Sequence, residues 1–108
     1  MNIKLPLVIQ SYVQASNAHD VPSILACFAD DAVVRDEGET LQGKKAIEAW
    51  IVKTIGKYKF HFEPLNVKEG NKEVVVAVKV SGTFDGSPVT LNYHFAIASG
   101  KISSFAVK

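Results

Sequence analysis

The amino-acid sequence predicts an α+β fold, in which helices from the first half of the chain pack on one face of a curved, mixed β-sheet. Three segments of the first half repeat apolar residues with the period of a helix, whereas the second half alternates apolar and polar residues. The length of 108 residues suits one domain with a single core. The resulting order of helix, helix, strand, helix and four strands is typical of this class.

The predicted helices are amphipathic. Residues 5–18 place apolar side chains at i, i+3, i+4, i+7 and i+8. A short second helix, residues 20–29, begins at Asp20, a favourable N-cap residue. The third covers residues 43–56, where Gly56 is available for a left-handed C-cap.

The second half of the chain predicts four strands joined as an antiparallel meander of hairpins. The strands are residues 58–62, 74–80, 89–97 and 103–107. Turn-forming residues at positions 70–71, 85–88 and 99–101 lie between them. A further short strand, residues 32–36, precedes the third helix, and the strands are expected to form one mixed sheet.

Charge and composition exclude several kinds of partner. Twelve basic and eleven acidic residues give a net charge of +1, and no basic cluster is longer than Lys44-Lys45, so we expect no nucleic-acid binding. No apolar run reaches the length of a membrane span, and no secretion signal is evident. Cys27 is the only cysteine, which excludes an intrachain disulfide and suits a reducing compartment. We therefore expect a cytoplasmic protein without a membrane partner.

Asp36 is the first candidate for a chemical role. Alternation places Ala32, Val34 and Asp36 on one face of the short strand. If this face points inward, the Asp36 carboxylate lies at the rim or floor of an apolar cavity, where poor solvation makes it a better general base. The alternative is a solvated carboxylate at the end of a strand, continuing the acidic run at residues 37–39.

Two tyrosines are candidates for the same cavity. Tyr12 lies on the buried stripe of the first helix, and Tyr93 lies on the inward face of the third long strand. A buried hydroxyl needs a partner, which can be a ligand oxygen or, as the alternative for Tyr12, the backbone or a water molecule. The expected pocket-lining residues are Phe28, Val34, Trp50, Phe60, Phe62, Val78, Leu91, Phe95 and Phe105, with Tyr58 and Phe84 as further aromatic walls. Inward aromatic residues can equally form a solid core.

Metal and cofactor sites are not expected. His19, His61 and His94 have no ligand spacing, and the single cysteine adds none. Residues 38–45 contain two glycines followed by Lys44 but lack the Ser or Thr of a phosphate-binding loop. No nucleophile elbow or dinucleotide fingerprint is present.

Residues 8–20, Ile24, 28–36 and 43–47 together resemble the nuclear transport factor 2-like superfamily, most closely its SnoaL-like and ketosteroid isomerase-like branch. The second half of the chain adds strand order and the region around Tyr93. This resemblance implies one domain over residues 1–108, built as a cone-shaped α+β barrel with three N-terminal helices packed in a strongly curved mixed sheet, a cystatin-like architecture. It also implies that Asp36 points inward.

The resemblance implies roles for two site residues, whereas a third site position differs from the family. Tyr12 falls where ketosteroid isomerases keep an oxyanion-hole tyrosine, and Asp36 falls where they keep the aspartate that moves a proton beside a carbonyl. At the position of their second donor, a protonated aspartic acid, this chain has Tyr93. The longer tyrosine side chain can donate a hydrogen bond but fills part of the pocket.

Two functions from different classes follow. The first is an enzyme of the isomerase or cyclase type, in which Asp36, Tyr12 and Tyr93 act on a small apolar carbonyl compound. The second is a noncatalytic ligand-binding or homodimeric interaction domain. A pocket filled by Tyr93 would favour the second. The expected homodimer would use mild outward residues of the sheet, namely Val75, Ala77, His94 and Ala96.

Overall fold

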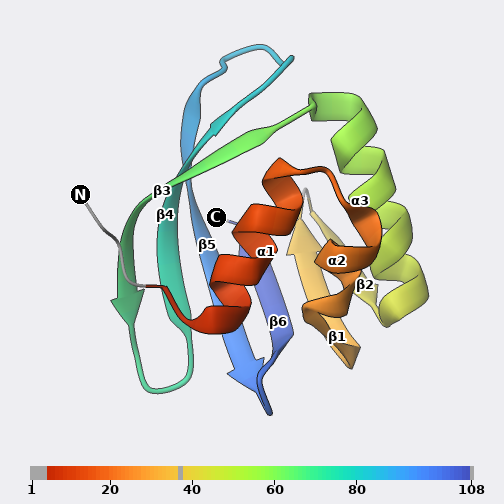
Figure 1. The fold of residues 1–108 in the computed structure, drawn as a ribbon, viewed down its shortest axis with the longest axis vertical. Helices are drawn as coiled ribbons and strands as arrows, with labels where there is room; N and C mark the ends of the chain where they lie inside the picture. The colour runs from red at the N-terminus through yellow and green to blue at the C-terminus, as the bar shows by residue number, and fades with distance from the viewer. Residues whose placement is uncertain (1–4, 37, 108) are drawn as a thin grey trace.

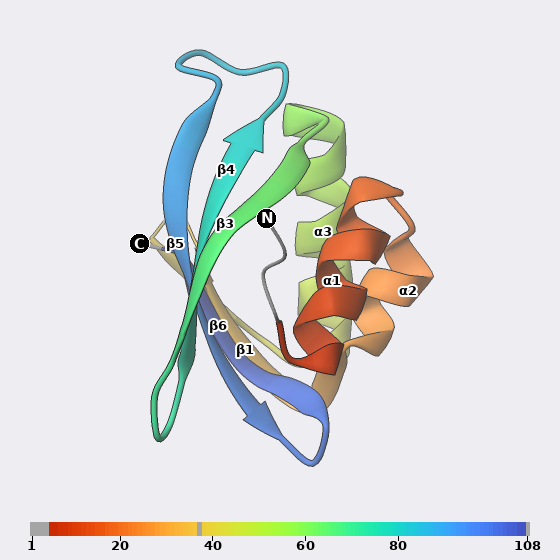
Figure 2. The same ribbon diagram turned by 60° about the vertical axis from the view of Figure 1, so that its left-hand side comes forward.

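The computed structural model describes residues 5–36 and 38–107, and in this part of the chain three helices cover one face of a six-stranded sheet (Figures 1 and 2). The helices are α1 (Leu7–Asn17), α2 (Val21–Ala26) and α3 (Lys44–Tyr58). The strands are β1 (Phe28–Asp36), β2 (Glu39–Gln42), β3 (His61–Glu69), β4 (Val74–Ser81), β5 (Val89–Ala98) and β6 (Lys101–Val107). The sheet curves around the helices as an open cone, which confirms the predicted α+β class.

The sheet is mixed, as predicted. Its strand order is β2-β1-β6-β5-β4-β3, and strands β3 to β6 form the expected antiparallel meander. Strand β1 pairs in parallel with β6, which brings Val34 opposite Phe105. Strand β1 is therefore an interior strand, between β2 and β6.

The second helix begins as predicted but ends early. Asp20 caps it, because its carboxylate accepts hydrogen bonds from the backbone N–H and the hydroxyl of Ser23. The helix ends at Ala26 rather than near residue 29, since Phe28 already starts β1. The first helix begins at Leu7, two residues later than predicted.

The third helix is longer than predicted, and the predicted glycine cap is wrong. Gly56 lies inside α3, which continues to Tyr58 and ends where Lys59 adopts a left-handed conformation with φ 46°. The N–H of Lys59 bonds the carbonyl oxygen of Ile55 and so closes the last turn. Tyr58 is consequently a helical residue and not the first residue of a strand, and β3 begins only at His61.

Strand β1 is longer than predicted, and β2 was not predicted at all. A register shift between Phe28 and Val33 leaves Asp30 and Asp31 exposed, which interrupts the alternation that marks a strand in the sequence. Strand β2 is short and largely polar, so its pairing with β1 has no apolar signal.

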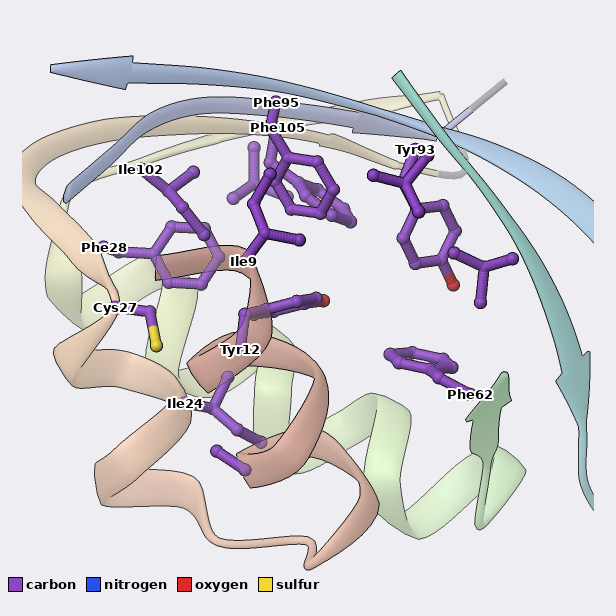
Figure 3. Packing of buried hydrophobic residues seen from close by; sticks show 14 of the residues in the cluster. Ile9, Tyr12, Ile24, Cys27, Phe28, Phe62, Tyr93, Phe95, Ile102 and Phe105 are labelled. Carbon is purple, nitrogen blue, oxygen red and sulfur yellow. The ribbon is translucent and has the colours of Figure 1, made fainter. Parts of the chain in front are cut away.

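Aromatic side chains pack between α1 and the sheet (Figure 3). Phe28, Phe95 and Phe105 are each 1% exposed and contact one another or the ring of Tyr12 edge-on or tilted. These contacts dock α1 onto the sheet. A cavity lies beside this cluster, and Tyr12 and Phe105 also belong to its wall.

Some of the sequence-based expectations concern residues that lie outside the described part of the chain. Residues 1–4, at the start of the chain, and Glu37, in the acidic run beside Asp36, are among those not described. No helix in the described part is both long enough and apolar enough to span a membrane.

Candidate functional site

A cavity of about 310 Å³ lies between the helices and the inner face of the sheet. Its wall is mostly apolar and includes five of the predicted lining residues, Trp50, Phe60, Phe62, Leu91 and Phe105. Asp36, Tyr12 and Tyr93 line the same cavity. Volume and polarity match those of small-molecule sites, which lie at about 300–1,000 Å³ and combine apolar walls with a few polar groups.

Four predicted lining residues lie elsewhere. Phe28, Val34, Val78 and Phe95 are absent from the cavity wall and are at most 1% exposed. They point inward, as the alternation predicted, but they lie where other side chains cover them completely. Their place is therefore the solid core.

Asp36 ends β1 with its side chain on the cavity wall, half-buried rather than in open solvent. The inward positions of Ala32 and Val34 on the same strand set this orientation, because both are fully buried. The indole N–H of Trp50 donates a hydrogen bond of 3.0 Å to Oδ2 of Asp36. Trp50 lies on α3, so this bond fixes the carboxylate between the helix and the end of the strand.

Tyr12 occupies the centre of the aromatic packing. Its side chain is 3% exposed, and its ring lies against Phe62 and the aromatic core (Figure 3). Burial raises the pKa of the Tyr12 hydroxyl well above its ordinary value, and the charges of Tyr93 and Asp36 raise it further, while a hydrogen bond from Ser16 acts in the opposite direction. The hydroxyl is therefore protonated throughout the physiological pH range.

Tyr93 enters the same space from β5. It is 5% exposed, and its ring packs edge-on against Phe62 and Phe105. Burial, and after it the negative charge of Asp36, raises the pKa of the Tyr93 hydroxyl. Both tyrosine hydroxyls point into the gap between α1 and the sheet (Figure 3). A cavity of about 310 Å³ remains beside the Tyr93 side chain, so Tyr93 forms a wall and does not fill the pocket.

The structure thus brings together all three predicted polar groups. Asp36 lines the same cavity as the two tyrosines, and its negative charge contributes to the raised pKa of both hydroxyls. Chemically, the set offers one carboxylate that can accept a proton and two neutral phenols that can donate hydrogen bonds to an oxygen.

The cavity wall contains two further polar residues that were not predicted, Ser16 and Thr54. Each follows a recognised site residue by four positions, Tyr12 and Trp50 respectively, and therefore lies on the same face of its helix. That spacing is a signal that could have found them. The bond between Trp50 and Asp36 gives no such signal, because it joins a helix to a strand.

The three histidines lie apart from one another. Nε2 of His19 is 2.8 Å from the carbonyl oxygen of Phe60, and Nδ1 of His94 is 3.2 Å from a carboxylate oxygen of Glu73. His61 is exposed on β3. In the described residues, no three His, Cys, Asp or Glu side chains are grouped so that they could hold a metal ion.

Comparison with known proteins gives a consistent family likeness. The model of the SnoaL-like domain matches residues 9–105. A solved structure from Sinorhizobium meliloti, described as a proposed polyketide cyclase, is 38% identical, with 96% of this chain and 95% of that chain covered and a TM-score of 0.93. No protein of curated function matches the sequence.

Two more distant structures share the fold. A Catenulispora acidiphila protein with a ketosteroid isomerase-like fold, in complex with trimethylamine, is 17% identical over 97% of this chain and 86% of that chain, with a TM-score of 0.84. A Mycobacterium tuberculosis protein in complex with estradiol-17β-hemisuccinate is 21% identical over 94% of this chain and 89% of that chain, with a TM-score of 0.79. At these identities the likeness concerns the fold alone.

Proposed function

We propose that this chain, which belongs to the SnoaL-like domain family of the nuclear transport factor 2-like superfamily, binds a small, largely apolar carbonyl compound and moves a proton beside its carbonyl group. One observation carries the proposal. Asp36, Tyr12 and Tyr93 converge on a single cavity whose other walls are mostly apolar. Such a site binds an apolar body and places its oxygen against the few polar groups.

Each polar group has a role in this reaction. The carboxylate of Asp36 accepts a proton from the carbon next to the carbonyl, and the electron pair of the broken C–H bond forms an enolate. The hydroxyls of Tyr12 and Tyr93 donate hydrogen bonds to the enolate oxygen. In the isomerisation of a β,γ-unsaturated ketone, Asp36 then returns the proton to the γ-carbon of the dienolate. In a cyclisation, the enolate carbon attacks a second carbonyl carbon of the same molecule, and the alkoxide oxygen that forms takes the proton from Asp36.

The two tyrosines are neutral hydrogen-bond donors in this division of roles. Both hydroxyls stay protonated at neutral pH, so they remain donors while negative charge develops on the oxygen. A general base contributes about 10²–10⁴-fold to such a rate. One oxyanion donor contributes about 10²–10³-fold. Trp50 supports the base by donating a hydrogen bond to Oδ2 of Asp36, which holds the carboxylate at the cavity wall.

Relatives support the type of ligand. The similar protein from Sinorhizobium meliloti is a proposed polyketide cyclase, and the Mycobacterium tuberculosis protein of the same fold holds a steroid ester. Both names refer to compounds with an apolar carbon skeleton and oxygen substituents. A cavity of about 310 Å³ is at the small end of the usual range, which favours a compact ligand here.

A binding screen with matched variants tests the proposal. Small hydrophobic ketones and lactones are screened by thermal shift and mass spectrometry against the wild type, Asp36→Asn and Tyr12→Phe. We expect a ketone that stabilises all three proteins but is turned over at least 100-fold more slowly by Asp36→Asn. Unchanged turnover in Asp36→Asn would show that Asp36 is not the base.

A noncatalytic binding domain is the second candidate, and the identity of residue 93 favours it. A tyrosine hydroxyl is a weaker acid than a carboxylic acid, and its pKa is raised further here, so it is a poorer oxyanion donor. Stabilisation of the wild type by a ketone, with no chemical change in the ketone over prolonged incubation, is the result that this second function predicts.

A further inference from the structure

The cavity opens at one end. The exposure of the inward-facing residues of β5 shows which end this is. Phe95 is 1% exposed and Tyr93 is 5% exposed, Leu91 is partly exposed, and Val89 is 37% exposed. Leu91 and Val89 nevertheless line the cavity. The exposed fraction therefore rises along the strand from the core to the loop between β4 and β5, and the mouth lies at that loop.

Two aromatic side chains meet at the mouth. Phe84 belongs to the loop between β4 and β5, and Tyr58 is the last residue of α3. Both line the cavity, and their rings contact edge to face, with centroids 5.7 Å apart and an interplanar angle of 88°. Figures 1 and 2 show the loop and the C-terminal end of α3 at the same end of the molecule.

The loop is attached to the helix, so the position of Phe84 is defined. The backbone N–H of Thr83 donates a hydrogen bond of 2.8 Å to the carbonyl oxygen of Tyr58. Within the loop, the N–H of Gly82 donates to the hydroxyl of Ser87 at 2.9 Å. A Cβ atom at Gly82 would overlap the carbonyl oxygen of Tyr58 and lie against the ring of Phe84, so only glycine permits this close approach.

We infer that the pair of Phe84 and Tyr58 determines ligand specificity by limiting how far a ligand can extend from Asp36 toward the mouth. This inference rests on the proposed binding of a carbonyl compound and adds its length as the selected property. An apolar chain gains affinity by burial until it reaches the two rings, and beyond that point it must displace their contact. Phe84 is the better residue to change, because it lies in a loop, whereas Tyr58 belongs to α3.

A homologous series of straight-chain methyl ketones, from 2-hexanone to 2-tetradecanone, tests this inference. Each added methylene that is buried should tighten binding about fourfold. In the wild type this gain should stop at a chain length set by the two rings. In Phe84→Ala it should continue for about two further methylenes, which is roughly a sixteenfold gain for the longer ketones, whereas Phe84→Trp should stop it earlier.

Two further variants separate this role from general damage. Gly82→Ala must displace the loop from α3 and should extend the permitted length although Phe84 is retained. Leu7→Ala changes an 80% exposed apolar residue away from the cavity and should leave the length limit unchanged. Circular dichroism and thermal melting confirm that each variant is folded.

The outcomes distinguish the two proposals. The same length limit in the wild type, Phe84→Ala and Phe84→Trp would overturn the role of Phe84 while leaving ketone binding intact. Absence of binding for every ketone in every protein would instead overturn the proposed function, and the length limit with it.

Discussion

Among single residues, Trp50 connects the candidate base, Asp36, to the cavity wall. It is the only tryptophan in the chain, it lines the cavity, and its indole N–H is bonded to Asp36. Its fluorescence therefore reports directly on the site. We expect a ketone that enters the cavity to change the emission of Trp50 in a saturable titration.

The substitution Trp50→Phe tests the hydrogen bond to Asp36 while an aromatic side chain stays in the cavity wall. Phe retains an aromatic surface against Phe105 but cannot donate a hydrogen bond. We expect kcat to fall about tenfold with little change in KM, because the carboxylate loses the hydrogen bond that holds it at the cavity wall. A loss confined to KM would indicate that Trp50 only packs against the ligand.

The raised pKa of Tyr12 predicts a loss of stability at alkaline pH. An unfolded tyrosine ionises near pH 10, whereas buried Tyr12 stays protonated above that value, so the folded state binds more protons than the unfolded state. The stabilising effect is complete below about pH 10 and is lost as the pH rises further. We expect the melting temperature of Tyr12→Phe to fall less between pH 9 and pH 11 than that of the wild type.

The residues that sequence reasoning placed correctly are those for which local period decides the face. Alternation put Asp36 on the inward face of its strand, and helical spacing put Tyr12 on the buried stripe of α1; both line the cavity. Alternation could not decide between cavity wall and core, and Phe28 and Phe95 proved to be core residues. That distinction depends on which side chains from other elements cover them.

Asn17 holds two elements of the cavity wall together. Its side-chain amide donates to the carbonyl oxygen of Phe62 at 3.0 Å and accepts from the N–H of Phe62 at 2.7 Å. It thereby acts like a short neighbouring strand at the edge of β3 and fixes Phe62 in the cavity wall. The clamp joins the last residue of α1 to a strand 45 residues away in the sequence.

Asn17→Ala should therefore destabilise the protein. It leaves a partly buried N–H and carbonyl group without this partner, and we expect a cost of about 2 kcal/mol in the free energy of unfolding. Chemical denaturation measures it. Gln14→Ala, at an exposed position of the same helix, is the matched control and should change the free energy by less than about 0.5 kcal/mol. Equal effects of the two substitutions would contradict the clamp.

The boundaries of the elements were predicted less well than their existence. The three helices and the four-stranded meander follow from the apolar period, but the end of α3 does not, because a left-handed cap at Lys59 carries no sequence signal comparable to Gly56. Strand β2 is too short and too polar to show alternation. Where pairing with a neighbour rather than local pattern makes the strand, one sequence alone does not reveal it.

The outer face of the sheet is where the whole molecule is expected to form a homodimer. Val75, Ala77, His94 and Ala96 are partly exposed on β4 and β5, and Val75 pairs directly with His94 across the two strands. They form a continuous, mildly apolar surface on adjacent strands. We expect light scattering to give twice the mass of one chain, and Ala77→Glu to shift the mass toward the monomer while leaving ketone binding intact. A single-chain mass for the wild type at all concentrations would contradict the dimer.

Proton transfer next to a carbonyl, carried out by Asp36 inside the cavity, is tested most directly by hydrogen–deuterium exchange in the ligand. A ketone that binds the wild type is incubated in heavy water, and deuterium at the carbon beside its carbonyl is followed by NMR. The wild type should introduce deuterium at least about 100-fold faster than Asp36→Asn at the same fraction bound. Equal exchange rates in the two proteins, with equal binding, would contradict the assignment of Asp36 as the base.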